Sequence, residues 1–123
     1  MPCRVLLVDD NSDFRRAARR LLERHGFAVV GEAESGVGGV QRARELRPDL
    51  VLLDVQLPDI DGFEVAERLS RLGMPLAVIL TSSLSGTDFG ALVARSSALG
   101  FVPKAELSAA TVEALLAPAP LSG

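Results

Sequence analysis

The stretch VLLDVQLPDIDGF, from Val51 to Phe63, begins as a run of apolar residues and meets a carboxylate at Asp54. After this acid the chain turns into a loop that contains Pro58 and Gly62. Burying an ionised carboxylate costs free energy unless a cation or several hydrogen-bond donors hold it. Asp54 therefore either caps a local turn or belongs to a functional site, and residues elsewhere in the chain distinguish these two roles.

Short apolar runs recur along the chain, and each is followed by a stretch of helical period. Strands are predicted at residues 4–8, 28–33, 50–53 and 76–80, and around Phe101. Strands that alternate with helices are typical of an α/β fold, in which helices cover both faces of a doubly wound parallel sheet. We therefore expect a five-stranded parallel sheet flanked by five helices.

The helices are bounded by recognisable start and stop signals. The first follows Asp9-Asp10-Asn11 and ends at Gly26, and the second begins after Ser35, a good N-cap residue, and runs to about residue 47. The other three are predicted at residues 62–72, 85–98 and 106–117. In the first helix one face is apolar, and the opposite face carries Arg15, Arg16, Arg19, Arg20 and Arg24. Such a face is usually only solvated, and a docking surface for an acidic partner is the less favoured interpretation.

Length and composition limit the classes of protein that the chain can be. It has 123 residues, 48% of them hydrophobic, which fits one domain over residues 1–117, followed by a tail or the start of a linker at 118–123. The net charge of -3 argues against direct nucleic-acid binding, which needs a clustered excess of Lys and Arg. A single cysteine, Cys3, and the absence of a membrane-spanning apolar run predict a cytoplasmic protein without membrane contact.

Five polar side chains are predicted to meet at one edge of the sheet, because parallel sheets place their sites at the carboxyl ends of the strands. They are Asp9, Asp10, Asp54, Thr81 and Lys104. Three acids in a small volume repel one another unless a cation compensates, and oxygen ligands without His or Cys favour Mg²⁺. A carboxylate nucleophile, a metal ion and an ammonium group suit phosphoryl transfer.

Together these features resemble the receiver domain of two-component response regulators, the CheY-like family, over residues 5–116. The resemblance rests on the acidic pair after the first strand, on the pattern D-x-x-x-P-x-x-x-G from Asp54 to Gly62, on Thr81, and on Phe101-Val102-Pro103-Lys104. It implies the flavodoxin-like strand order 2-1-3-4-5.

The resemblance also implies a role for each site residue. Asp54 is the phosphoacceptor, Lys104 contacts the phosphoryl group, and Thr81 and Phe101 form the switch pair. The Mg²⁺ ion is bound by Asp54, by Asp9 and Asp10 directly or through water, and by the backbone carbonyl of Gln56.

Three features depart from the family pattern. Ala105 follows the lysine, whereas many receivers have a proline there, and Pro103 precedes it. Gln56 and Ser83 occupy positions that influence the lifetime of the phosphoryl group in the family. Phe101 lacks the hydroxyl of the tyrosine often found at its position, so it can signal only by packing.

Other classes of protein fit the residues less well. Separately, the acidic pair could cap a helix, Asp54 and Thr81 could be strand-end residues, and Lys104 could be a surface charge. An aspartyl phosphatase would need a second Asp where Gln56 stands, and an FMN-binding flavodoxin would need a phosphate loop in place of the acidic pair. A degenerate receiver that only docks would have lost one of the site residues.

As a receiver, the chain would be a phosphorylation-controlled switch with slow autophosphatase activity, not a conventional enzyme. The partner implied is a histidine kinase or a phosphotransfer protein. The output surface would lie around the fourth helix, the fifth strand and the fifth helix. Two further partners stay open, namely a second copy in a homodimer and a C-terminal output domain absent from this chain.

Overall fold

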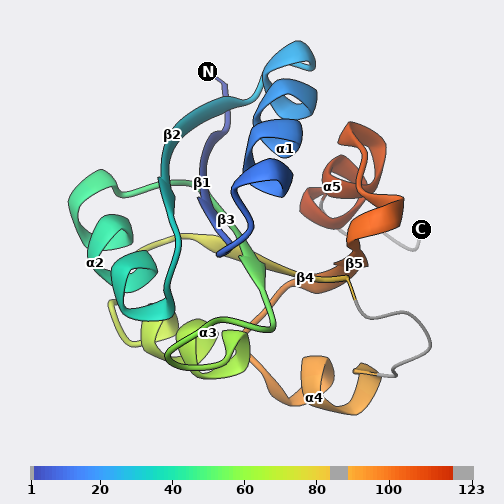
Figure 1. Ribbon diagram of the computed structural model, residues 1–123. Coiled ribbons are helices and arrows are strands. Elements are labelled where there is room, and N and C mark those ends of the chain that lie inside the picture. Colours follow the sequence, from blue (N-terminus) through green and yellow to red (C-terminus); the bar gives the residue numbers. More distant parts are fainter. Residues whose placement is uncertain (1, 84–88, 118–123) are drawn as a thin grey trace, which may run out of the picture.

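The computed structural model describes residues 2–83 and 89–117. Its strands are β1 (Arg4–Val8), β2 (Ala28–Ala33), β3 (Leu50–Asp54), β4 (Ala77–Ser82) and β5 (Gly100–Pro103). They form one parallel sheet in the order β2-β1-β3-β4-β5 (Figure 1). The expected α/β fold and strand order are confirmed.

The helices of the described residues are α1 (Ser12–Arg24), α2 (Gly36–Leu46), α3 (Gly62–Ser70), α4 (Gly90–Arg95) and α5 (Ala109–Leu116), and a 3-10 turn, η1, spans Lys104–Glu106. Helices α1 and α5 lie on one face of the sheet, and α2 and α3 lie on the other (Figure 1). None of the helices in the described ranges is long and apolar enough to cross a membrane.

The central strands are buried on both faces because helices cover both sides of the sheet. Successive residues of a strand point to opposite faces, so Leu7 and Leu52 join the apolar layer under α1 and α5, whereas Leu6 and Leu53 join the layer under α2 and α3. Every residue of β3 is buried. The strand has a continuous apolar sequence that ends in Asp54. The carboxylate of Asp54 therefore lies at the carboxyl edge of the sheet, between the two helical layers.

Side-chain caps set where most helices begin. Asn11, Ser35 and Asp61 accept hydrogen bonds from backbone N–H groups in the first turns of α1, α2 and α3. At α5, Ser108 and Thr111 form a capping box. The sequence prediction placed the start of this helix at residue 106, but Glu106 belongs to η1. Helix α5 begins only at Ala109, after the cap at Ser108.

Other boundaries also differ from the sequence prediction. The fourth helix was expected over 85–98; residues 85–88 lie outside the described ranges, and the described part is helical only to Arg95. Strand β4 continues through Thr81 to Ser82. The outermost strand on this side, β5, has only four residues and ends at Pro103.

Candidate functional site

The strand register brings the predicted residues to one edge of the sheet. Asp54, the last residue of β3, pairs in register with Thr81 of β4. Asp9 follows β1, whose last residue, Val8, pairs with Leu53. Lys104 follows β5 and begins η1. The site is thus assembled from four adjacent strand ends of a parallel sheet.

The three acids come close enough to share one cation. Oxygen atoms of Asp9, Asp10 and Asp54 all lie within 4.8 Å of one another. Asp9 and Asp54 are buried, at 2% and 5% exposed, whereas Asp10 is open to solvent. Three hard oxygen donors, of which one faces water, fit Mg²⁺, which binds to few carboxylates and keeps several waters.

Lys104 supplies the positive charge among these acids. Its Nζ lies 2.7 Å from Oδ2 of Asp9 and 3.2 Å from Oδ2 of Asp54. Burial disfavours the charged ammonium, but the contacts with Asp9 and Asp54 outweigh it, so the pKa of Lys104 is raised. The lysine therefore stays protonated and partly balances the acids.

Asp54 is held in a setting that opposes its ionisation. Burial raises the pKa of its carboxyl, and the charge of Asp9 raises it further. The N–H of Gln56, which donates to Oδ1 at 3.0 Å, and the ammonium of Lys104 act in the other direction. A cation bound by the acids would favour the ionised form of Asp54, which is the form that can act as a nucleophile.

The hydroxyl group of Thr81 is buried without a hydrogen-bond partner among the described residues. The residue as a whole is 1% exposed. Buried hydroxyl groups are normally paired, because an unpaired one loses its hydration without compensation. An oxygen atom added to Asp54, the neighbour of Thr81 in register, would offer this hydroxyl an acceptor.

Phe101 lies half-buried on β5, where it pairs in register with Leu80. Its ring centroid is 5.5 Å from that of Phe89, the residue before α4, and the Phe89 centroid is 6.1 Å from that of Phe63 on α3. The three rings connect β5 with both helices. This packing was not anticipated from the sequence.

Two residues in the first turns of α1, which were not predicted as site residues, reach the site. The ring centroid of Phe14 lies 4.4 Å from the Lys104 ammonium. Arg15, assigned to a solvated face, donates to the backbone carbonyl of Asp9 and to the carboxylate of Glu32 on β2. The positions of these two consecutive residues in the sequence do not predict such contacts, because the contacts depend on how α1 lies over the sheet.

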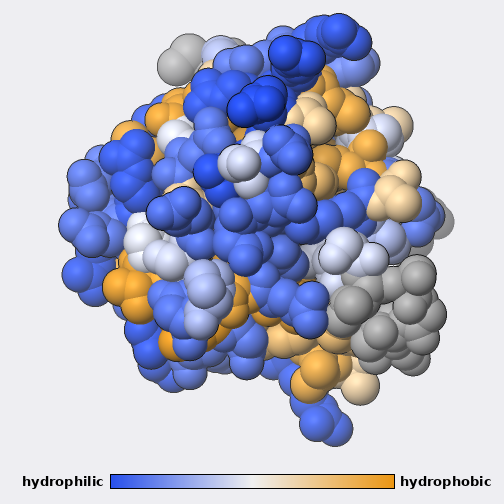
Figure 2. Space-filling view, in the orientation of Figure 1, coloured by the Kyte–Doolittle hydropathy of each residue, from blue (hydrophilic) through white to orange (hydrophobic). Residues whose placement is uncertain are grey.

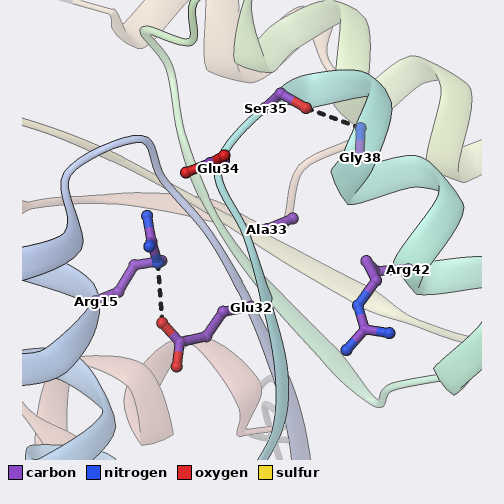
Figure 3. A pocket seen from close by; sticks show the side chains of 7 residues that line it. All are labelled: Arg15, Glu32, Ala33, Glu34, Ser35, Gly38 and Arg42. Atoms are coloured by element: carbon purple, nitrogen blue, oxygen red, sulfur yellow. Dashed lines mark hydrogen bonds and ion pairs between the residues drawn. The ribbon is translucent and has the colours of Figure 1, made fainter.

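Arg15 and Glu32 also line a groove between α1 and α2, next to the acids. Figure 3 shows the two side chains joined in the space between α1 and β2, with Arg42 of α2 on the opposite side of β2. The further residues that line the groove are Ala33, Glu34, Ser35 and Gly38. Two guanidinium groups face two carboxylates here, so the groove lacks the single sign of charge that a phosphate-binding surface needs.

Two contacts hold the loop between Asp54 and α3 in place. A Cβ atom on Gly62 would stand 2.4 Å from the backbone oxygen of Asp54, so only glycine fits there. Asp59 accepts hydrogen bonds of 2.8 Å from the backbone N–H groups of Gly36 and Val37 at the start of α2. These two donors lower the pKa of Asp59 to about 2.

A cluster of three acids, two of them buried, with a lysine and a threonine at the carboxyl edge of a five-stranded parallel sheet defines a class of signalling domain, the receiver. The family model of the response regulator receiver domain matches residues 5–116. The chain belongs to this family and is therefore a receiver domain of two-component signalling.

Individual relatives agree with this assignment. The chain is 43% identical over 103 residues to BvgA of Bordetella pertussis, which covers 84% of this chain and 49% of BvgA. It is 30% identical to the chemotaxis protein CheY of Bacillus subtilis, covering 85% of this chain and 87% of CheY. The solved receiver domain of NarL from Mycobacterium tuberculosis superposes with a TM-score of 0.83 at 28% identity, covering 95% of this chain and 98% of that one. The chain spans about half the length of BvgA and of similar curated relatives.

Proposed function

We propose that Asp54 accepts a phosphoryl group from a phosphohistidine of a histidine kinase or phosphotransfer protein, and that this modification switches the domain between two states. The arrangement around Asp54 supports the proposal. The carboxylate is buried, lies 3.2 Å from the Lys104 ammonium, and pairs in register with Thr81, whose hydroxyl is unpartnered among the described residues.

The transfer needs few protein groups. A carboxylate oxygen of Asp54 attacks the phosphorus, the P–N bond breaks, and its electron pair stays on the imidazole nitrogen of the donor. The product is an acyl phosphate on Asp54, and the ammonium of Lys104 compensates the charge on its phosphoryl oxygens. Attack by water on the same phosphorus later releases inorganic phosphate and restores the carboxylate. One chain thus forms and slowly hydrolyses its own modification, which makes it a switch and not a conventional enzyme.

Mg²⁺ would be held by Asp9, Asp10 and Asp54 together with the backbone carbonyl of Gln56. The cluster fits the ion, because its three carboxylates supply oxygen ligands within 4.8 Å of one another and Lys104 balances only part of their charge. When bound, the ion would supply positive charge against the transferring phosphoryl group.

The switch would act through Thr81 and Phe101. A hydrogen bond from the Thr81 hydroxyl to a phosphoryl oxygen satisfies a group that is otherwise buried without a partner. We propose that the movement of Thr81 lets the Phe101 ring turn inward, which changes its packing on Phe89 and hence the start of α4. The surface of α4, β5 and α5 would then report the modification, because the added group interacts differently with the two states.

The partners follow from the same proposal. Residues 1–117 would form the receiver, and 118–123 a tail or the start of a linker to an output domain, as suggested by relatives about twice as long. The kinase or phosphotransfer protein would meet the chain in the cytoplasm, and homodimer formation stays open. A net charge of -3 gives this chain no reason to bind nucleic acid itself.

The test is to incubate the protein with Mg²⁺ and an acyl phosphate and to map the modified residue by mass spectrometry. We expect one phosphoryl group on Asp54, none in Asp54→Asn, and none when a chelator removes the metal. Asp61→Asn is the matched control, because Asp61 lies in the same loop but caps α3. Modification that persists in Asp54→Asn would overturn the proposal.

A further inference from the structure

The ammonium of Lys104 has an aromatic neighbour besides its two acidic ones. Its Nζ lies 4.4 Å from the ring centroid of Phe14, while it remains 2.7 Å from Asp9 and 3.2 Å from Asp54. The lysine side chain is 13% exposed, so its charge meets these three groups where little water reaches it. A cation over an aromatic face is attracted by the ring quadrupole, most strongly where water is excluded.

Phe14 is itself held in a fixed position. Its N–H donates to the Asn11 side chain at 3.1 Å, which caps α1, and its ring packs partly buried against the apolar layer beneath α1 and α5. The ring therefore contacts Lys104 from α1, whereas the lysine itself belongs to the segment that follows β5. A rigid ring on one side limits the positions that the flexible lysine chain can adopt.

We propose that Phe14 is a positioning residue that keeps the Lys104 ammonium beside Asp54 during phosphoryl transfer. This inference rests on the proposed phosphorylation of Asp54. The carboxylates of Asp9 and Asp54 hold the ammonium only while their own charges are free. Once a divalent cation takes up those charges, the ion pairs weaken, whereas the contact with the uncharged ring persists. The ring also leaves the positive charge of the lysine unneutralised, so the ammonium stays available to the phosphoryl oxygens.

The rate of modification by an acyl phosphate, at a fixed saturating Mg²⁺ concentration, tests this role. In Phe14→Leu we expect the maximal rate to fall roughly 2- to 30-fold, the range that a cation–π contact contributes. The donor concentration at half-maximal rate and the Mg²⁺ dissociation constant should stay within about twofold of wild type, because lysine acts on charge that develops in the transition state. Phe14→Tyr keeps an aromatic face and should retain most of the rate.

Phe27→Leu is the matched control for the loss of a packed ring. Phe27 belongs to the same apolar layer as the residues under Phe14 but lies at the far end of α1, just before β2. We expect Phe27→Leu to lower the free energy of unfolding without slowing the modification by the acyl phosphate. Equal rates in wild type and Phe14→Leu, an equal loss in Phe14→Tyr, or an equal loss in Phe27→Leu would each overturn the positioning role.

A readout without phosphorylation separates this inference from the proposed function. The ε-methylene group of Lys104 is bonded to the Nζ atom that lies 4.4 Å from the ring centroid, so the NMR shifts of its protons should move toward random-coil values in Phe14→Leu, with and without Mg²⁺ and beryllofluoride. In Phe27→Leu they should not move. If the wild-type protein takes no phosphoryl group but the shifts behave as expected, the proposed function fails while the lysine–ring contact stands. Unchanged shifts in Phe14→Leu would show that the contact is absent.

Discussion

Gly62 lies close against the backbone of Asp54, the proposed phosphoacceptor. Its own N–H donates to the carbonyl of Val55 at 2.8 Å, and an added Cβ would meet the backbone oxygen of Asp54 at 2.4 Å and the Cα of Val55 at 2.8 Å. These neighbours are backbone atoms at the end of a fully buried strand, so they cannot move aside cheaply. The glycine in the D-x-x-x-P-x-x-x-G pattern is therefore a steric requirement for placing Asp54.

Replacing Gly62 by alanine should displace the Asp54 segment. We expect Gly62→Ala to lower the free energy of unfolding by about 1–3 kcal/mol, as overpacking typically does, and to slow phosphorylation. Urea unfolding and the acyl phosphate assay measure the two effects. Glu64→Ala, an exposed change in the same turn of α3, should leave both near wild type. A Gly62→Ala protein of undiminished stability would contradict the close approach.

The site residues at the ends of strands could be predicted from the sequence, whereas the site residue contributed by helix α1 could not. The structure places Asp9, Asp10, Asp54 and Lys104 together, as the parallel-sheet argument required, although their roles stay predictions. Phe14 was identified only as part of an apolar helix face. Its contact with Lys104, 90 positions along the chain, depends on the angle at which α1 crosses the sheet, and no local pattern encodes that angle.

Between elements, Asp59 ties the loop after β3 to the start of α2. Its two carboxylate oxygens accept from the N–H groups of Gly36 and Val37, which α2 itself leaves unpaired. Ile60 packs beside them, since a Cβ on Gly36 would stand 2.5 Å from its Cγ1 atom. The brace holds the loop that contains Gln56, the residue whose carbonyl we propose as a metal ligand.

This brace predicts a pH dependence of stability. The pKa of Asp59 is about 2 in the folded chain, below the ordinary aspartate value of about 3.9. A depressed pKa contributes stability that is present above the unfolded value and is lost as the pH falls toward 2. We therefore expect Asp59→Asn to lower the free energy of unfolding at pH 7 and to flatten its decline between about pH 5 and pH 2.

The comparison uses urea unfolding at several pH values. Asp59→Ala is the matched variant, because asparagine retains one acceptor for the N–H groups of α2 whereas alanine retains none. Alanine should therefore cost more stability at neutral pH, with the same flattened dependence. Parallel curves for wild type and both variants would rule out the brace.

The elements themselves were largely predictable. Five apolar runs gave all five strands, because a strand buried on both faces needs a continuous apolar sequence. Helix ends were predicted less well. The last helix was expected to begin at residue 106, but α5 begins at Ala109, directly after the capping box that Ser108 forms with Thr111. Helix α4 ends at Arg95 and not at the expected residue 98, and none of its residues is buried, so packing does little to extend it.

Over the whole molecule, polar side chains dominate the visible surface, with apolar ones gathered between α1 and α5 and near α4 (Figure 2). Leu92 of α4 is 49% exposed, and Leu99, which follows α4, is 48% exposed. Leu92 belongs to the surface that we propose as the output, and Leu99 lies between two of its elements, α4 and β5. Exposed apolar residues of this size are common singly, so they add no argument of their own.

Binding of Mg²⁺ should stabilise the folded chain as a whole, because the acids come together only in the native state. At a free concentration ten times the dissociation constant, the gain is about 1.4 kcal/mol, which should raise the melting temperature by several degrees. Calorimetry with MgCl₂ against NaCl of equal ionic strength measures it. The rise should disappear in Asp9→Asn/Asp10→Asn, and an equal rise in that variant would place the metal elsewhere.

The outer strand β5 has a consequence for assembly. An exposed sheet edge is a template on which another chain can add a strand, and proteins limit this risk with short edge strands and prolines. Here the edge has four residues and ends at Pro103, which has no N–H to donate. Concentrated solutions of this protein should therefore resist growth of the sheet from this side into fibrils, and any association that occurs there should use helix surfaces.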